Sequence, residues 1–174
     1  MLQKFEKHIH TNFPFLKDSK LLLAISGGLD SVVLMHLCNQ LKLSISLAHC
    51  NFKLRNEESD LDEEFVKYIS QISSNQIFTT FFNTELVAKK EQISIQIAAR
   101  ELRYTWFQEL VKKHQFDFIL TAHHLDDSLE TFLIHLTRGS GLEGFTGIPS
   151  TNGNIIRPLL PFSRAEILEY ATKN

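Results

Sequence analysis

The sequence predicts an α/β fold, a doubly wound parallel sheet of five strands with helices on both faces. Short apolar runs alternate along the chain with longer segments of helical periodicity. This alternation is typical of a parallel sheet whose two faces are covered by helices. The length of 174 residues, 43% of them hydrophobic, is sufficient for one compact core. We therefore expect a single domain over residues 1–174.

The expected elements follow one another in a regular order. Strands are expected at residues 21–26, 44–50, 77–82, 116–121 and, from a weaker pattern, 154–159. Helices are expected at residues 31–42, 58–73, 91–114, 125–138 and 163–172. Ligands of such sheets bind beyond the carboxyl ends of the strands, so functional residues are expected just after each strand.

The first expected strand ends at the loop SGGLDS, which leads directly into an apolar helix. Its two glycines allow a tight turn, and the helix start offers free N–H groups to an anion such as phosphate. The serine hydroxyls add donors, and the carboxylate of Asp30 is a candidate magnesium ligand, directly or through water. A capping turn without a ligand is the alternative for the loop alone. The predicted phosphate-binding residues are Ser26, Gly27, Gly28, Leu29, Asp30 and Ser31.

The sequence SGGLDS, which lies between a buried strand and an apolar helix, resembles the PP-loop of the N-type ATP pyrophosphatases. The Walker A pattern GxxxxGK(S/T) is absent. The resemblance implies cleavage of ATP between its α- and β-phosphates, with AMP passing to the substrate. GMP synthetase, NAD synthetase, asparagine synthetase and tRNA-modifying enzymes share this loop, so it indicates the type of reaction but not the substrate.

The second expected strand runs into the segment HCNFKLR. It resembles the HxNHxLR segment of the tRNA(Ile)-lysidine synthetases, with Phe52 where that family often has a second histidine. The resemblance implies that His49 and Asn51 contact adenosine, and a histidine satisfied within the strand end is the alternative for His49. The acidic stretch at residues 57–64 is expected to be a solvated helix start, where carboxylates favour the positive end of the dipole.

The helix expected at 91–114 contains AARELRY, which is similar to the AARxxRY segment of the same family. Arg100, Arg103 and Tyr104 stand at i, i+3 and i+4 and share one helical face. Two guanidiniums on one face suit a phosphate whose charge grows as the α–β bond breaks. A solvated face paired with Glu101 is the alternative, and the resemblance favours a catalytic role for both arginines.

The fourth expected strand is followed by HHLDDSLET at residues 123–131, similar to the HHxDDxxET segment of the lysidine synthetases. Asp127 and Glu130 share a helical face, and carboxylates are the hard oxygen ligands that magnesium needs. The resemblance implies catalytic roles for both, and Asp127 joins Asp30 as a candidate metal ligand. The predicted substrate-binding residues are His123, Asp126, Asp127 and Arg138, the last through an anticodon phosphate.

The resemblance extends through RPLL at 157–160 and RAEI at 164–167, and so covers residues 20–170. It implies ATP and Mg²⁺ as co-substrate and metal, and a tRNA(Ile) with a CAU anticodon and L-lysine as partners. The wobble cytidine would be adenylated at its C2 oxygen, and the lysine amine would then displace AMP to give lysidine. Longer family members continue into domains that help to grip the tRNA, so we expect this chain to be the N-terminal catalytic domain, without them.

Composition limits the function classes. Eighteen basic and twenty acidic residues give a net charge of −2, which argues against a surface that binds nucleic acid over its whole extent. No apolar run is long enough to span a membrane and the start does not resemble a signal peptide, so we expect a cytoplasmic protein. Cys38 and Cys50 form no CxxC pair and are expected to be buried free thiols.

Two alternatives to lysidine synthesis remain at this point. A sulfur-inserting PP-loop enzyme acting on a tRNA cytidine shares the loop, but such enzymes typically carry CxxC pairs, which this sequence lacks. A nucleotide-binding module without catalysis would need the loop but neither the arginine pair nor the HHxDDxxET segment.

Overall fold

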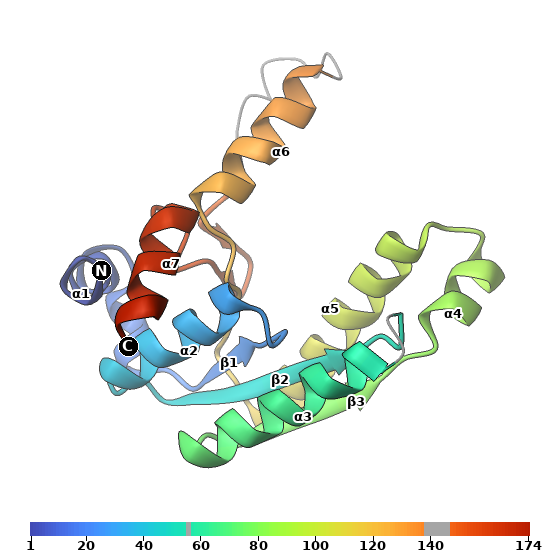
Figure 1. Ribbon diagram of the computed structural model, residues 1–174, viewed down its shortest axis with the longest axis horizontal. Helices are drawn as coiled ribbons and strands as arrows, with labels where there is room; N and C mark the ends of the chain where they lie inside the picture. Colours follow the sequence, from blue (N-terminus) through green and yellow to red (C-terminus); the bar gives the residue numbers. More distant parts are fainter. Residues whose placement is uncertain (55–56, 138–146) are drawn as a thin grey trace.

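The computed structural model describes residues 1–54, 57–137 and 147–174 (Figure 1). Over these residues the strands form a six-stranded sheet in the order β3-β2-β1-β4-β6-β5. Its strands are β1 (Leu21–Ala24), β2 (Ile45–Asn51), β3 (Ile77–Phe81), β4 (Phe118–Leu120), β5 (Thr151–Asn152) and β6 (Ile155–Ile156). All neighbouring strands are parallel except β5 and β6. The α/β fold is confirmed, with one short antiparallel strand added to the five that were expected.

The helices cover both faces of this sheet. They are α1 (Leu2–Asn12), the 3₁₀ helix η1 (Pro14–Asp18), α2 (Leu29–Gln40), α3 (Glu57–Ile72), α4 (Thr84–Glu91), α5 (Ile95–His114), α6 (Leu125–Thr137) and α7 (Arg164–Lys173). Alternate side chains of β1 point to opposite faces, as strand geometry requires. Leu21 and Leu23 pack in a core with α1, α2 and α7, whereas Leu22 packs in a second core with Phe107 of α5.

The path of the chain places a ligand site above β1 and β4. From β1 the chain moves outward through β2 to β3, and it then returns to form β4 on the other side of β1. The segment that follows β1 leads toward β2, whereas the segment that follows β4 leads toward β6, so the two connections run in opposite directions along the sheet. A crevice forms at such a switch point beyond the strand ends, which is where ligands bind in this class of fold.

Two helical regions differ from the expectation. The helix expected at 91–114 is α5, which begins four residues later, where Ser94 caps it by accepting a hydrogen bond from the Ile97 N–H (3.2 Å). Helix α4 before it was not expected, and it ends where Gln92 adopts a left-handed conformation. Helix α1 was not expected from the sequence, yet Phe5 and Ile9 are buried in the core.

The strand expected at 154–159 is much shorter, since only Ile155–Ile156 pairs within the sheet.

Helix α6 extends away from the body of the molecule (Figure 1). It begins directly beyond β4, and its described side chains include none that is fully buried. Helix α7, in contrast, packs beside α2, where the Tyr170 hydroxyl lies 3.0 Å from His36 Nδ1. The starts of α2, α6 and α7 therefore meet at the end of the sheet where the crevice lies.

Candidate active site

The SGGLDS loop is held in shape by its own serines. The Ser31 hydroxyl donates a hydrogen bond to the Gly28 carbonyl (2.8 Å) and accepts one from the Ser26 N–H (3.2 Å). The Gly28 N–H in turn donates to Ser26 Oγ (3.2 Å). Gly27 has φ +90°, a conformation that a side chain would strain. The loop thus enters α2 with its backbone fixed, and the start of the helix faces the crevice.

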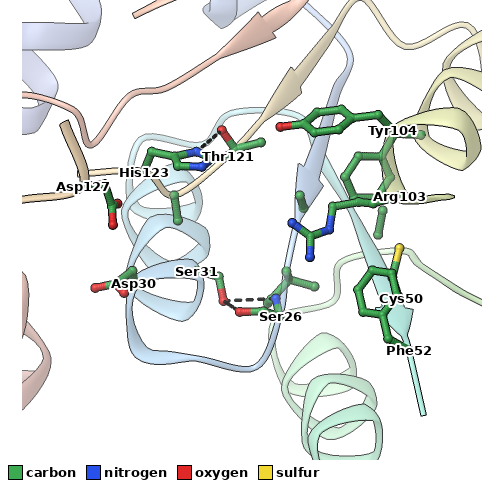
Figure 2. A pocket seen from close by; sticks show the side chains of 15 residues that line it. Ser26, Asp30, Ser31, Cys50, Phe52, Arg103, Tyr104, Thr121, His123 and Asp127 are labelled. Carbon is green, nitrogen blue, oxygen red and sulfur yellow. Dashed lines mark hydrogen bonds between the residues drawn. The ribbon is translucent and has the colours of Figure 1, made fainter. Parts of the chain in front are cut away.

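A cavity of about 220 Å³ lies beyond the ends of β1, β2 and β4. Six residues of the predicted site line it: Ser26, Asp30, Ser31, Arg103, His123 and Asp127. Figure 2 shows the Arg103 guanidinium projecting from α5 into the space between the loop and His123. Hydroxyl, carboxylate, guanidinium and imidazole groups from distant parts of the chain therefore face one cavity.

The two arginines of α5 rest on aromatic rings. The Arg103 guanidinium lies 5.1 Å from the centre of the Phe52 ring, and Phe52 is stacked on Phe82 at 5.8 Å. The Arg100 guanidinium lies 5.0 Å from the centre of the Tyr104 ring. Such contacts restrict a long side chain and leave its N–H donors free. Arg103 lines the cavity, whereas Arg100 is exposed and lies outside the lining.

His123 is oriented by a neighbouring hydroxyl within the cavity. Its Nδ1 lies 3.0 Å from the Thr121 hydroxyl, a contact drawn in Figure 2. Burial lowers the pKa of His123, and the positive charge of Arg157 lowers it further. Because both effects disfavour the imidazolium form, His123 is held neutral near pH 7.

The start of α6 is organised around His124. Asp127 Oδ2 accepts a hydrogen bond from the His124 N–H (2.8 Å), and the buried His124 ring places Nε2 3.8 Å from an Asp30 oxygen. Asp126 instead accepts from the backbone N–H of Arg164 (2.8 Å) and, like Glu130, lines a separate groove on α6. Of the three predicted carboxylates of this segment, only Asp127 lines the cavity, among the residues described.

Comparisons with known proteins identify the family of this chain. A model of the PP-loop domain matches residues 1–174. The chain belongs to the PP-loop domain family. Among curated proteins, it is 45% identical to the tRNA(Ile)-lysidine synthase of Bacteroides thetaiotaomicron, over 97% of this chain and 39% of that protein. It is 41% identical to the tRNA(Ile)-lysidine synthase of Chlorobaculum tepidum, over 97% of this chain and 52% of that protein. The PP-loop domain thus spans about half or less of these relatives.

Solved structures show the same fold at lower identity. The U34-tRNA thiolase of Methanococcus maripaludis superposes with a TM-score of 0.76 at 20% identity, over 98% of this chain and 62% of that one. The NH3-dependent NAD synthetase of Campylobacter jejuni superposes with a TM-score of 0.69 at 16% identity, over 99% of this chain and 73% of that one. At these identities the likeness establishes the architecture of the PP-loop domain only.

Asp30 is suited to a metal that arrives with the nucleotide. Its Oδ1 is buried and has no hydrogen-bond partner in the described part of the chain, whereas Oδ2 is paired with the Arg164 guanidinium. Within the same residues, no group of three or more His, Cys, Asp or Glu side chains could hold a metal ion. Magnesium commonly binds one or two carboxylates and completes its shell with water and phosphate oxygens, so Asp30 and Asp127 fit a substrate-borne ion.

The predicted adenosine residues of the PP-loop domain are buried beside the cavity and do not line it. His49 Nδ1 donates to the Ile25 carbonyl (2.9 Å), and its Nε2 is buried without a partner among the described residues. The Asn51 amide donates to Asp60 (2.8 Å) and Glu63 (3.0 Å) of α3. Asn51 therefore fixes the acidic start of α3, and its predicted contact with adenosine remains a prediction.

Cys50 differs from the expected buried, uninvolved thiol, because it lines the cavity. Burial raises its pKa to about 12, although the charge of Arg103 opposes that effect. Cys38 is fully buried, as expected. The predicted substrate residue Arg138 lies outside the described residues.

Two basic residues that lie near lining residues of the cavity were not assigned a role from the sequence. Arg164 reaches Asp30 from the first turn of α7, and Arg157 lies buried behind His123, donating from Nη1 to the Pro149 carbonyl (2.7 Å). Both belong to segments that were recognised as similar to the family, RPLL and RAEI. The sequence pattern therefore marked both segments, but only the packing of α7 against α2 and the pairing of β6 with β4 show which residues these side chains approach.

Proposed function

We propose that this chain is the catalytic PP-loop domain, in one unit over residues 1–174, of an enzyme that makes lysidine in tRNA(Ile). One observation carries the proposal. The cavity joins the phosphate loop to Arg103, His123 and Asp127, which belong to the two segments that distinguish lysidine synthetases from other PP-loop enzymes. The curated relatives named tRNA(Ile)-lysidine synthase support it, at up to 45% identity among those compared.

In the adenylation step, the loop residues and the arginines of α5 have different roles. The loop N–H groups and the Ser26 and Ser31 hydroxyls hold the phosphates that leave as pyrophosphate. The C2 oxygen of the wobble cytidine attacks the α-phosphorus, and the Arg103 guanidinium stabilises the charge that grows on it. Arg100 contributes from the same helical face. Magnesium, where bound at Asp30 and Asp127, supplies charge neutralisation for the leaving pyrophosphate.

The second step requires an uncharged amine. Lysine is an ammonium ion near pH 7, so its side chain must lose a proton before it attacks C2 and displaces AMP. We assign to Asp127 both the contact with this ammonium and the acceptance of its proton, because its carboxylate faces the cavity while those of Asp126 and Glu130 face a separate groove. His123 lines the same cavity as Asp127 and is uncharged near pH 7, so we assign it to the wall along which the cytidine enters.

The partners follow from the same proposal. The substrates are ATP, L-lysine and a tRNA(Ile) whose CAU anticodon is single-stranded, so the target base can enter the cavity at little unstacking cost. None of the helices in the described ranges combines the length and apolar character that crossing a membrane requires. We place the reaction in the cytoplasm, together with its tRNA substrate.

A sulfur-inserting enzyme is the second candidate, favoured by the superposition with the U34-tRNA thiolase. Sulfur transfer of that kind uses reactive cysteines as thiolates. The only cysteine at the cavity, among described residues, is Cys50, whose pKa of about 12 keeps it protonated at neutral pH. This chemistry favours amine attack over sulfur transfer.

The test uses the complete protein that contains this domain, incubated with ATP, Mg²⁺, radiolabelled lysine and a transcript of tRNA(Ile) bearing CAU. Lysine-specific, ATP-dependent labelling of the tRNA supports the proposal, and Asp30→Ala should abolish pyrophosphate release while the circular dichroism spectrum is unchanged. Pyrophosphate release without lysine transfer would support the sulfur-inserting alternative. ATP binding with neither product would leave a nucleotide-binding module.

A further inference from the structure

The first residue of α7 joins three helix starts at the edge of the cavity. The Arg164 side chain is ion-paired with Asp30 at the start of α2, and its backbone N–H donates to Asp126 at the start of α6 (2.8 Å). Arg164 is separated from Asp30 by 134 positions in the chain and from Asp126 by 38 positions, and these two contacts bring the three residues together. Arg164 therefore lies next to Asp30, a residue of the loop that lines the cavity at the start of α2.

The backbone of Arg164 is fixed, whereas its side chain is not. Ser163 and Glu166 form a capping box that closes the start of α7, and Ile167 is fully buried in the core. The Arg164 side chain is 47% exposed, and that of its partner Asp30 is 24% exposed. An ion pair so open to water is weak and exchanges easily. The guanidinium can thus change partners without any movement of α7.

The loop lacks a cation of its own. None of the six residues of SGGLDS is a lysine or arginine, although the triphosphate that it would hold carries several negative charges. Arg103 projects toward the cavity from the side of α5. Arg164 approaches from the opposite helix layer, beside the end of the loop that leads into α2. A guanidinium at that position suits phosphate oxygens, which it can bind through two parallel hydrogen bonds.

We propose that Arg164 is a phosphate-binding residue that changes partners when nucleotide binds. Without nucleotide, its guanidinium neutralises Asp30, whose second oxygen is buried and unpartnered within the described residues. When Mg·ATP enters, the metal takes over the Asp30 carboxylate and the guanidinium moves to the β- or γ-phosphate. This rests on the ATP-binding part of the proposed function, and on neither lysine nor tRNA.

The test measures binding of α,β-methylene-ATP with Mg²⁺ by isothermal titration calorimetry, without tRNA or lysine. Arg164→Ala should weaken binding about tenfold, the usual loss for one charge-assisted hydrogen bond. Arg164→Lys should retain part of the affinity. Lys173→Ala, which removes one exposed positive charge from the far end of the same helix, serves as the matched control and should bind as the unaltered protein does.

A double-mutant cycle separates a phosphate contact from support of Asp30. If Arg164 binds phosphate, adding Arg164→Ala to Asp30→Asn should again weaken analogue binding about tenfold. If Arg164 acts only by holding Asp30, the second substitution should have no effect, and the inference is wrong. Unchanged affinity of Arg164→Ala alone would also overturn the inference, provided that melting curves show this variant to be folded. If Arg164→Ala is not folded, Arg164→Gln takes its place in the same measurements. Failure of lysine transfer with these binding results intact would count against the proposed function alone.

Discussion

Replacing Phe52 by alanine tests whether an aromatic stack fixes Arg103. The centre of the Phe52 ring lies 5.1 Å from the Arg103 guanidinium and 5.8 Å from the centre of the Phe82 ring, and the two rings are stacked at an interplanar angle of 29°. A partly exposed cation–π contact contributes about 1 kcal/mol, and an aromatic pair contributes about 1 kcal/mol beyond its buried area. The free energy of unfolding should therefore fall by about 2 kcal/mol, which lowers the Tm of a domain of this size by about 4–8 °C.

The matched control for this variant is Phe81→Ala. Phe81 is adjacent to Phe82 in the chain but is 72% exposed, so its truncation should change the free energy of unfolding by less than about 0.5 kcal/mol. Thermal melts followed by circular dichroism compare the two variants, and the rate of pyrophosphate release reports on Arg103. Phe52→Ala should also release pyrophosphate more slowly. Equal melting temperatures for the two variants would refute the stacking role of Phe52.

Three further predictions concern the cavity. Cys50 should react slowly with iodoacetamide at pH 7.5 in the folded protein, since its pKa of about 12 leaves almost no thiolate, and rapid labelling seen by mass spectrometry would contradict this. The pKa of His123 is lower in the folded protein than its ordinary value of 6.5, so the unfolded state binds a proton at a higher pH than the folded state does. The folded protein should therefore lose stability as the pH falls below 6.5. Melting curves of His123→Gln across pH 5–8 should show a smaller loss, and an unchanged pH dependence would argue against the lowered pKa. Ser31→Ala leaves the Ser26 N–H and the Gly28 carbonyl without their common partner, which should lower the free energy of unfolding by about 1–2 kcal/mol in urea titrations; an unchanged midpoint would show that water replaces the hydroxyl.

The strands and the loop were predictable because their signals are local. The apolar run at 21–26 and the glycines that follow are confirmed as β1 and the turn into α2, which begins two residues earlier than expected. Residues that follow β1 and β4 share one cavity because these strands are neighbours, and the rule that ligands bind at strand ends anticipated this.

What could not be predicted depends on non-local packing. The pair of Arg164 and Asp30 joins residues 134 positions apart, and no periodicity in either segment indicates it. Helix α4 was missed, and the end of α4 lacks a glycine or proline because Gln92 adopts the left-handed turn, so the pattern placed the start of α5 four residues too early. Glu130 shares a helical face with Asp127, yet α6 leaves the sheet at an angle that carries Glu130 away from the cavity.

The position of α7 makes the candidate nucleotide site a product of the finished fold. A chain emerging from the ribosome presents SGGLDS early, but the hydrogen bond from Arg164 to Asp126 and the burial of Ile167 require the last described helix to have docked. A ligand that binds only the assembled site stabilises that assembly by mass action. Nucleotide binding and the docking of α7 therefore favour each other, and amide hydrogen exchange in α7 should slow when ATP is bound.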